Sequence, residues 1–140
     1  CDKGADQHQA NGFGATPLFV ASFSGHGEVV RFLCGLGACM ERRNKLGYTP
    51  LIAAAFQGHP NVVRCLCEFG ASKDWPANDG TTAVCAAAAC GHLDIVKYLY
   101  HANADILRTT NLNVAPIQSA RFAGHTSVVD FLEKVTIKAE

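Results

Sequence analysis

The same short motifs recur four times along the sequence at equal intervals. The dipeptide Gly-His occurs at residues 25–26, 58–59, 91–92 and 124–125, which defines a 33-residue step. Thr-Pro-Leu or a close variant keeps this register at residues 16–18, 49–51, 82–84 and 115–117, and a leucine recurs at positions 33, 66, 99 and 132. Several series that share one period predict a repeat protein in which each unit packs on its neighbours.

Each unit is predicted to contain two helices. A Thr hydroxyl followed by Pro is a favourable helix start, because the hydroxyl accepts a backbone N–H and Pro suits the first helical position. The first helix is expected to end near Ser24, Gln57, Cys90 and Ala123. The second is expected to begin near Glu28, Asn61, Asp94 and Ser127. Its apolar spacing predicts one buried stripe, which in the first unit is Val29, Val30, Phe32 and Leu33.

Residues that tolerate the left-handed backbone conformation follow the second helix of the first three units, at Gly37, Gly70 and Asn103. The same residue types recur in the loops, at Gly14, Gly47, Gly80 and Asn113. Small residues at one first-helix position should let neighbouring helices approach closely: Ala21, Ala54, Ala87 and Ala120.

From Asn11 to Glu140 the pattern resembles the ankyrin-repeat family. The resemblance implies an all-α fold, an ankyrin-repeat solenoid of helix-turn-helix units with hairpin loops and about four repeats. The sequence departs from the family pattern after Thr-Pro-Leu, where the usual histidine is replaced by Phe19, Ile52, Cys85 and Gln118. The fourth unit also has Ala115 in place of the capping Thr, a loss expected to cost about 1 kcal/mol.

The repeat register predicts the organisation of the chain. Residues 1–10 are interpreted as the tail of a preceding ankyrin repeat and therefore as part of a longer protein, because Cys1 to Ala5 matches Cys34 to Ala38. The repeats are placed at 11–43, 44–76, 77–109 and 110–140. The last is expected to be a C-terminal cap, since its second helix carries polar residues around the apolar stripe: Asp130, Glu133, Lys134 and Lys138.

Composition narrows the function classes. Twelve basic and twelve acidic residues leave no net charge, so we expect no nucleic-acid partner. No apolar run approaches the roughly 20 residues that span a bilayer, so direct membrane insertion is not expected. Seven cysteines without a CxxC pair predict free thiols and an intracellular, cytoplasmic protein. No phosphate-binding loop is present, and neither a cofactor nor a small-molecule substrate is expected.

The histidines and cysteines are the side chains that could bind a metal ion or act in catalysis. His26, His59, His92 and His125 share one repeat position, but stacked helices lie about 8–10 Å apart and zinc needs ligands within about 2.3 Å. This ladder is interpreted as structural, as is the ladder of Cys1, Cys34 and Cys67.

The sequence gives little support for a catalytic role. A hydrolase that uses Cys85, Cys90 or His92 would need an orienting group and an oxyanion site, which the sequence does not reveal. No catalytic, metal or cofactor residue is therefore predicted.

The resemblance implies a partner site on the concave surface, formed by hairpin tips and the first helices. The residues at these positions are Phe13, Phe23, Arg43, Lys45, Leu46, Tyr48, Phe56, Gln57, Asn78, Asp79, Cys90, Leu112 and Phe122. Phe23, Phe56 and Phe122 form one column, and the sequence leaves open whether they are exposed or packed on a hairpin. The sequence also leaves open whether Trp75 packs against its loop or anchors a partner.

The main hypothesis is a non-enzymatic protein-protein interaction module that binds a protein or peptide partner on its concave surface. The alternative is a structural or targeting arm of a larger protein, such as a ubiquitin-ligase receptor, channel, kinase or bacterial effector, whose activity lies outside this chain. The oligomeric state is left open.

Overall fold

The computed structural model describes residues 14–139, with side chains up to Ile137. Within that range the chain forms helices and no strands. They run as α2 Pro17–Ser24, α3 Gly27–Gly35, α4 Pro50–Gln57, α5 Pro60–Glu68, α6 Ala83–Cys90, α7 Leu93–His101, α8 Pro116–Ala123 and α9 Thr126–Ala139. The expected ends of the first helices are confirmed, and the second helices begin one residue earlier than expected.

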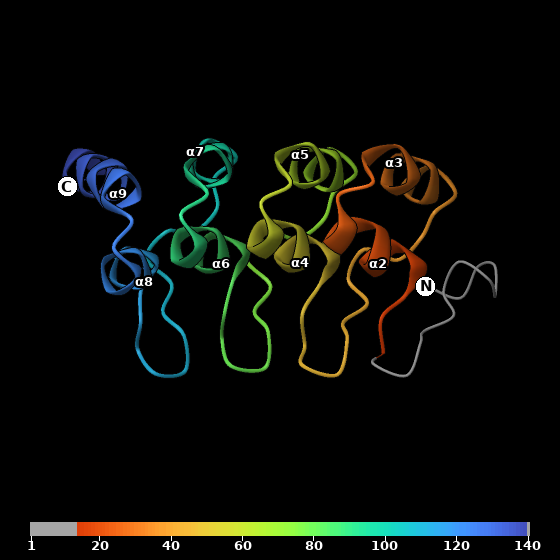
Figure 1. Cartoon of the computed structure of the whole chain (residues 1–140), viewed down its shortest axis with the longest axis horizontal. Helices are drawn as coiled ribbons and strands as arrows, with labels where there is room; N and C mark the ends of the chain where they lie inside the picture. The colour runs from red at the N-terminus through yellow and green to blue at the C-terminus, as the bar shows by residue number, and fades with distance from the viewer. Residues whose placement is uncertain (1–13, 140) are drawn as a thin grey trace.

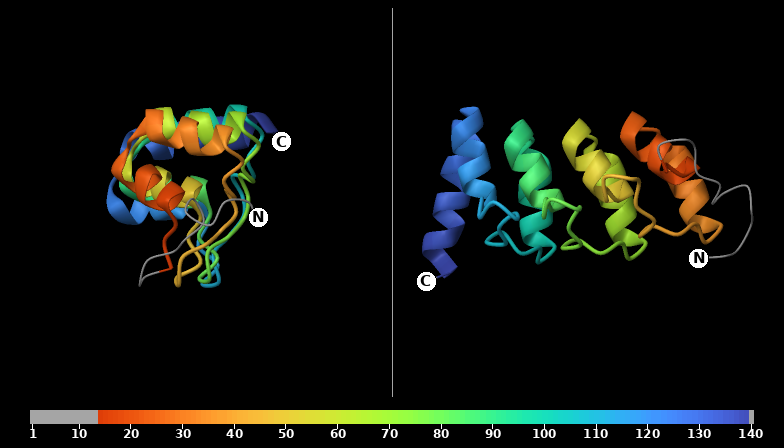
Figure 2. Two further views of the ribbon diagram at one scale, coloured as in Figure 1. Left: turned by 90° about the vertical axis from the view of Figure 1, so that its right-hand side faces the viewer. Right: turned by 90° about the horizontal axis from the view of Figure 1, so that it is seen from below.

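The helices form two rows (Figure 1). The inner row is α2, α4, α6 and α8, and the outer row is α3, α5, α7 and α9. Hairpin loops extend from the inner row away from the outer row, so inner helices and hairpins meet at an angle (Figure 2). We call the surface inside this angle the concave surface. The all-helical solenoid predicted from the repeat pattern is confirmed.

Three first helices begin with the predicted threonine cap. The Oγ atoms of Thr16 and Thr49 each accept the N–H of the residue three positions on at 3.2 Å, and Thr82 Oγ accepts that of Cys85 at 3.4 Å. Ala115 has no such group, but the N–H of Ala115 donates to Gln118 Oε1 at 2.8 Å. Gln118 therefore supplies half of a capping box.

Left-handed residues lie where the sequence predicts them. Asn103 and Asn113 have φ of 70° and 62°. Asparagine is one of the few residue types with a side chain that adopts this region readily. The glycines at the equivalent positions of the other units are left-handed as well.

Small residues make the inner row compact. Ala54, Ala87 and Ala120 are fully buried, and Ala21 is nearly so. Because an alanine side chain projects so little, the inner helices of adjacent repeats pack directly on one another.

The buried stripe predicted for α3 is confirmed for two of its four residues and wrong for the other two. Val30 and Leu33 are buried, whereas Val29 is 47% exposed and Phe32 is 64% exposed. Their equivalents on α5, Val62 and Cys65, are buried. The outer helix of the preceding repeat, α3, packs against α5, and no helix within residues 14–139 covers α3 in the same way.

Candidate functional site

The histidines of the Gly-His pairs connect adjacent repeats. His59 Nε2 donates to the carbonyl oxygen of Phe23 at 3.0 Å, and His92 Nε2 donates to that of Phe56 at the same distance. Since a carbonyl only accepts, Nε2 carries the hydrogen in both rings. No group of three potential metal ligands exists among the residues described. The observed contacts support the structural interpretation of this ladder.

Asparagines connect the hairpin tips in the same way. Asn78 Nδ2 donates to the carbonyl oxygen of Lys45 at 3.1 Å, and Asn111 Nδ2 donates to that of Asn78 at 2.9 Å. The backbone N–H of Asn78 also donates to the carbonyl oxygen of Leu46 at 3.2 Å. The amide of Asn78, one of the predicted partner-binding residues, therefore aligns neighbouring hairpins.

A third set of inter-repeat links was missed by sequence reasoning. Glu41 Oε1 accepts the N–H of Ser72 at 2.8 Å, and Asp74 Oδ1 accepts that of Asp105 at the same distance. The two carboxylates occupy the same position of successive repeats, and this shared position is the signal that could have revealed them. Both anchor the loop that leads to the next hairpin.

The cysteines are mainly packing residues. Cys34, Cys65 and Cys85 are buried free thiols, and Cys67 is half-buried. Burial raises the pKa of the Cys34 and Cys67 thiols to about 11, which keeps both protonated near neutral pH. Cys39 is disulfide-bonded and corrects the expectation of free thiols at that position, because spacing along the chain does not show which sulfurs meet. Cys1 lies outside the described residues.

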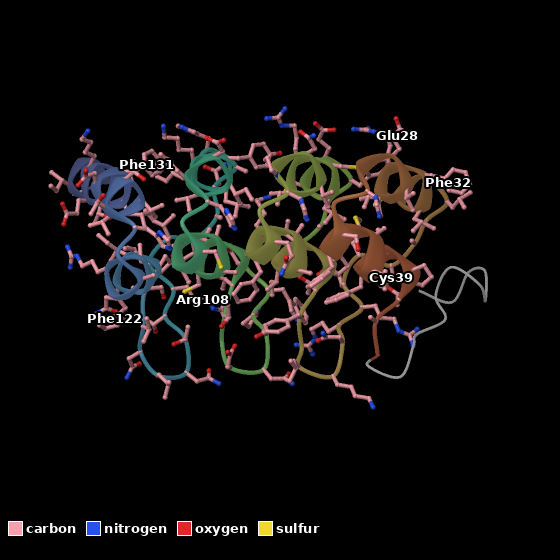
Figure 3. All side chains as sticks on the ribbon, in the orientation of Figure 1. Glu28, Phe32, Cys39, Arg108, Phe122 and Phe131 are labelled. Atoms are coloured by element: carbon pink, nitrogen blue, oxygen red, sulfur yellow. The ribbon has the colours of Figure 1, made fainter. Side chains whose placement is uncertain are left out.

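The apolar members of the predicted partner site differ in exposure. Leu112 is 85% exposed, Phe122 82%, Leu46 62% and Phe23 48%. Phe56 is half-buried, because the ring of Tyr48 lies edge-on to it at 5.6 Å between centroids. The column of phenylalanines is thus exposed at its two ends, Phe23 and Phe122, and covered at its centre (Figure 3 labels Phe122 on α8). Phe13 lies outside the described residues.

The polar members of that predicted set reach solvent. Lys45, Gln57, Asp79 and Cys90 are exposed, as are Arg43 and Asn78. Asp79 Oδ1 accepts the N–H of Thr81 at 3.0 Å and so shapes its own hairpin. Arg43 turns to Trp75, with its guanidinium carbon 5.4 Å from the ring centroid.

Comparison with protein families agrees with this architecture. A model of three consecutive ankyrin repeats matches residues 36–110, more than half of the chain, and a model of a single ankyrin repeat matches residues 13–45. The chain belongs to the ankyrin-repeat family. No curated protein matches it. No helix within residues 14–139 is long and apolar enough to cross a membrane.

Proposed function

We propose that this chain is a non-enzymatic interaction module that binds a protein or peptide partner on its concave surface. Ankyrin repeats are generally protein-protein interaction modules. The observation that carries the proposal for this chain is the exposure of large apolar side chains on hairpins and inner helices. Leu46, Leu112 and Phe122 each expose more than 60% of their surface there.

These exposed side chains contribute little to internal packing. The inter-repeat links described above use histidine, asparagine and carboxylate groups, which leaves the apolar groups available to a partner. Apolar groups that become buried at the centre of an interface contribute most of its binding energy.

Tyr48 and Phe56 provide a rigid centre for this surface. Their edge-to-face contact fixes both rings before a partner arrives, and both also pack against the core. A preorganised aromatic pair loses little conformational entropy on binding. We therefore place the centre of the site at these two rings and its rims at Phe23, Leu46, Leu112 and Phe122.

The environment of the cysteines and the histidine considered as catalytic groups supports the non-enzymatic part of the proposal. Burial raises the pKa of the Cys85 and Cys90 thiols, whereas a nucleophilic cysteine needs a lowered pKa. His92 uses Nε2 to bind the Phe56 carbonyl, so that nitrogen is not offered to a neighbouring thiol as a base.

The test compares two variants in capture from cell lysate followed by affinity measurement with the purified, identified partner. The triple variant Leu46→Ala/Leu112→Ala/Phe122→Ala removes exposed apolar groups from the concave surface. Ile137→Ala is the control, because Ile137 is 70% exposed but lies on outer helix α9. The triple variant should bind at least about tenfold more weakly. Equal binding by the two variants, both folded by circular dichroism, would contradict the assigned surface.

An intracellular, cytoplasmic location is part of the proposal. Within the part of the chain that the structure describes, free thiols occur at Cys34, Cys65, Cys67, Cys85 and Cys90, which favours a reducing compartment, whereas the disulfide at Cys39 is of a kind that is rare in the cytosol. Microscopy of the tagged protein, together with thiol counting on material purified under a thiol-blocking agent, tests this location.

A further inference from the structure

A second surface lies at the loops between the outer helices and the hairpins. A cavity of about 430 Å³ opens there, which is within the range of about 300–1,000 Å³ typical of ligand sites. Its lining mixes charged, polar and apolar side chains and consists of Arg43, Ser72, Asp74, Trp75, Pro76 and Arg108. We call it the Trp75 cavity.

Two arginines from different repeats line the cavity around one tryptophan. Trp75 is 44% exposed, and the Arg43 guanidinium lies over its ring at 5.4 Å. Arg108 follows Trp75 by one full repeat step, so it comes from the equivalent place on the next loop. Figure 3 labels Arg108 just below α6, beside the last hairpin.

Neither arginine has a carboxylate partner among the residues that the structure describes. The ion pairs in that part of the chain join Arg31 to Glu68 and Arg121 to Glu133. Arg43 makes a long bond from Nη1 to the carbonyl oxygen of Pro76, at 3.4 Å. Two guanidinium groups without a carboxylate partner among the described residues therefore line one cavity.

One oxygen of the acidic group in the lining, Asp74, already accepts a hydrogen bond from the next repeat. Asp74 Oδ1 accepts the backbone N–H of Asp105 at 2.8 Å. Toward the preceding repeat, the N–H of Ser72 donates to Glu41 Oε1 at 2.8 Å. These bonds fix the segment that carries Trp75 relative to the repeats on either side of it, so the cavity exists before a ligand binds.

We propose that the Trp75 cavity binds an acidic segment of a protein partner. A Glu or Asp carboxylate would bind the guanidinium groups of Arg43 and Arg108, because guanidinium and carboxylate match as bidentate pairs. The methylene groups of that side chain would pack on the exposed face of Trp75. Apart from Arg43, none of the residues that line this cavity belongs to the predicted concave site, and the proposal stands whether or not that surface binds.

A nucleic acid is the less favoured occupant. Exposed tryptophans do stack on bases, but strands bind in grooves that carry a continuous positive charge. Here the cavity has two arginines beside Asp74, and the whole chain has no net charge. A short peptide with a few carboxylates fits this limited charge better than a phosphate backbone does.

The chain contains a single tryptophan, so its fluorescence reports on this cavity alone. The probe is a short synthetic peptide of alternating Glu and Gly, with Gln replacing Glu in the control peptide. The Glu peptide should change the emission of Trp75 saturably at low ionic strength and bind more weakly at about 0.15 M salt. The Gln peptide should produce no saturable change.

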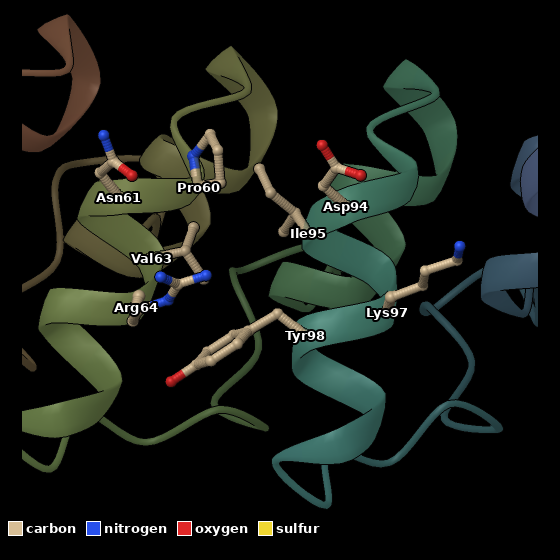
Figure 4. Close-up of a pocket in the computed structure, with 8 residues that line it drawn as sticks. All are labelled: Pro60, Asn61, Val63, Arg64, Asp94, Ile95, Lys97 and Tyr98. Atoms are coloured by element: carbon tan, nitrogen blue, oxygen red, sulfur yellow. The ribbon is translucent and has the colours of Figure 1, made fainter.

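A matched pair of arginine variants separates local recognition from general charge. Arg108→Gln should weaken binding of the Glu peptide about fivefold or more, since a hydrogen bond to a charged group is lost. Arg64→Gln is the control, because Arg64 lies over Tyr98 at 5.7 Å in a similar pairing on the outer helices (Figure 4). It should bind as the unmodified protein does.

Three results would overturn the proposal. One is the absence of saturable binding of the Glu peptide at low ionic strength. Another is an equal loss of affinity in the two arginine variants, which would assign the effect to net charge. The last is tighter binding of a single-stranded oligothymidylate than of the Glu peptide, which would assign the cavity to nucleic acid.

Discussion

His92 Nε2 lies 3.0 Å from the carbonyl oxygen of Phe56, and this hydrogen bond ties the last turn of α4 to the start of α7 in the next repeat. The bond between His59 and Phe23 repeats it one unit earlier. One side chain thus satisfies a carbonyl at a helix C-terminus that the helix itself leaves unpaired.

Replacing this histidine should weaken the stack. His92→Ala should lower the free energy of unfolding by about 1–2 kcal/mol, because it leaves the Phe56 carbonyl without its partner. Urea denaturation monitored by circular dichroism measures the change. His101→Ala serves as the control, since His101 is exposed at the end of α7, and should alter stability by less than about 0.5 kcal/mol. Equal losses would show that the inter-repeat bond is not the cause.

Gly58 should not tolerate a side chain. It has φ of +78°, and a Cβ there would meet His92 Cε1 at 2.5 Å. Gly58→Ala should cost about 2 kcal/mol or more, from the left-handed backbone and from displacement of His92. Gly35→Ala in α3 is the matched control, because a Cβ at Gly35 meets no atom within 4 Å. It should be neutral or stabilising by up to about 1 kcal/mol in the same urea titration.

The caps of the first helices should respond in opposite directions. Thr82→Ala removes the Oγ that accepts the Cys85 N–H and should cost about 1 kcal/mol. Ala115→Thr adds such a group to α8 while leaving the bond from the Ala115 N–H to Gln118, so it should stabilise by about 0.5–1 kcal/mol. Thermal and urea unfolding check both signs. A destabilised Ala115→Thr variant would show that α8 starts differently from its equivalents.

Stability should fall at alkaline pH. The thiols of Cys34 and Cys67 have a pKa of about 11 in the folded chain, above the ordinary value of 9.0, because burial disfavours the thiolate. The folded state therefore holds these protons more tightly than the unfolded state does. Their contribution is complete below about pH 9 and is lost as the pH rises toward 11.

Urea midpoints measured under a reducing agent between pH 8 and 11 test this linkage. The double variant Cys34→Ala/Cys67→Ala should show a shallower fall over that interval, because the two shifted thiols are gone. An unchanged slope in the double variant would assign the alkaline loss to other groups.

The fold was predictable because its determinants are local and repeated. Thr16, Thr49 and Thr82 indicate helix starts through a bond to the residue three positions on, and the left-handed positions indicate helix ends. Such signals depend on neighbours in the sequence, so they recur in each unit with the repeat. The failure at Val29 and Phe32 has the opposite cause, since their burial depends on a neighbouring helix that local pattern does not supply.

The candidate site was predictable only by position. Register placed Tyr48 and Phe56 on the concave surface, but the edge-to-face contact that half-buries Phe56 depends on side-chain packing across the hairpin. The pairing of Arg43 with Trp75 joins the loops of two successive repeats, and the repeat register did not indicate it. No spacing rule indicates that an arginine of one loop will pair with the tryptophan of the loop in the next repeat.

The inter-repeat bonds also determine how the protein would respond to mechanical load. His59–Phe23, His92–Phe56, Asn78–Lys45 and Asn111–Asn78 each join one unit to the next, and none bypasses a unit. Tension applied to the two ends would therefore act on the interfaces between repeats in series, with the bonds of one interface sharing the load. A stretched chain should release one repeat at a time, each extending by roughly 110 Å. Its force–extension curve would then show discrete steps, one for each repeat released.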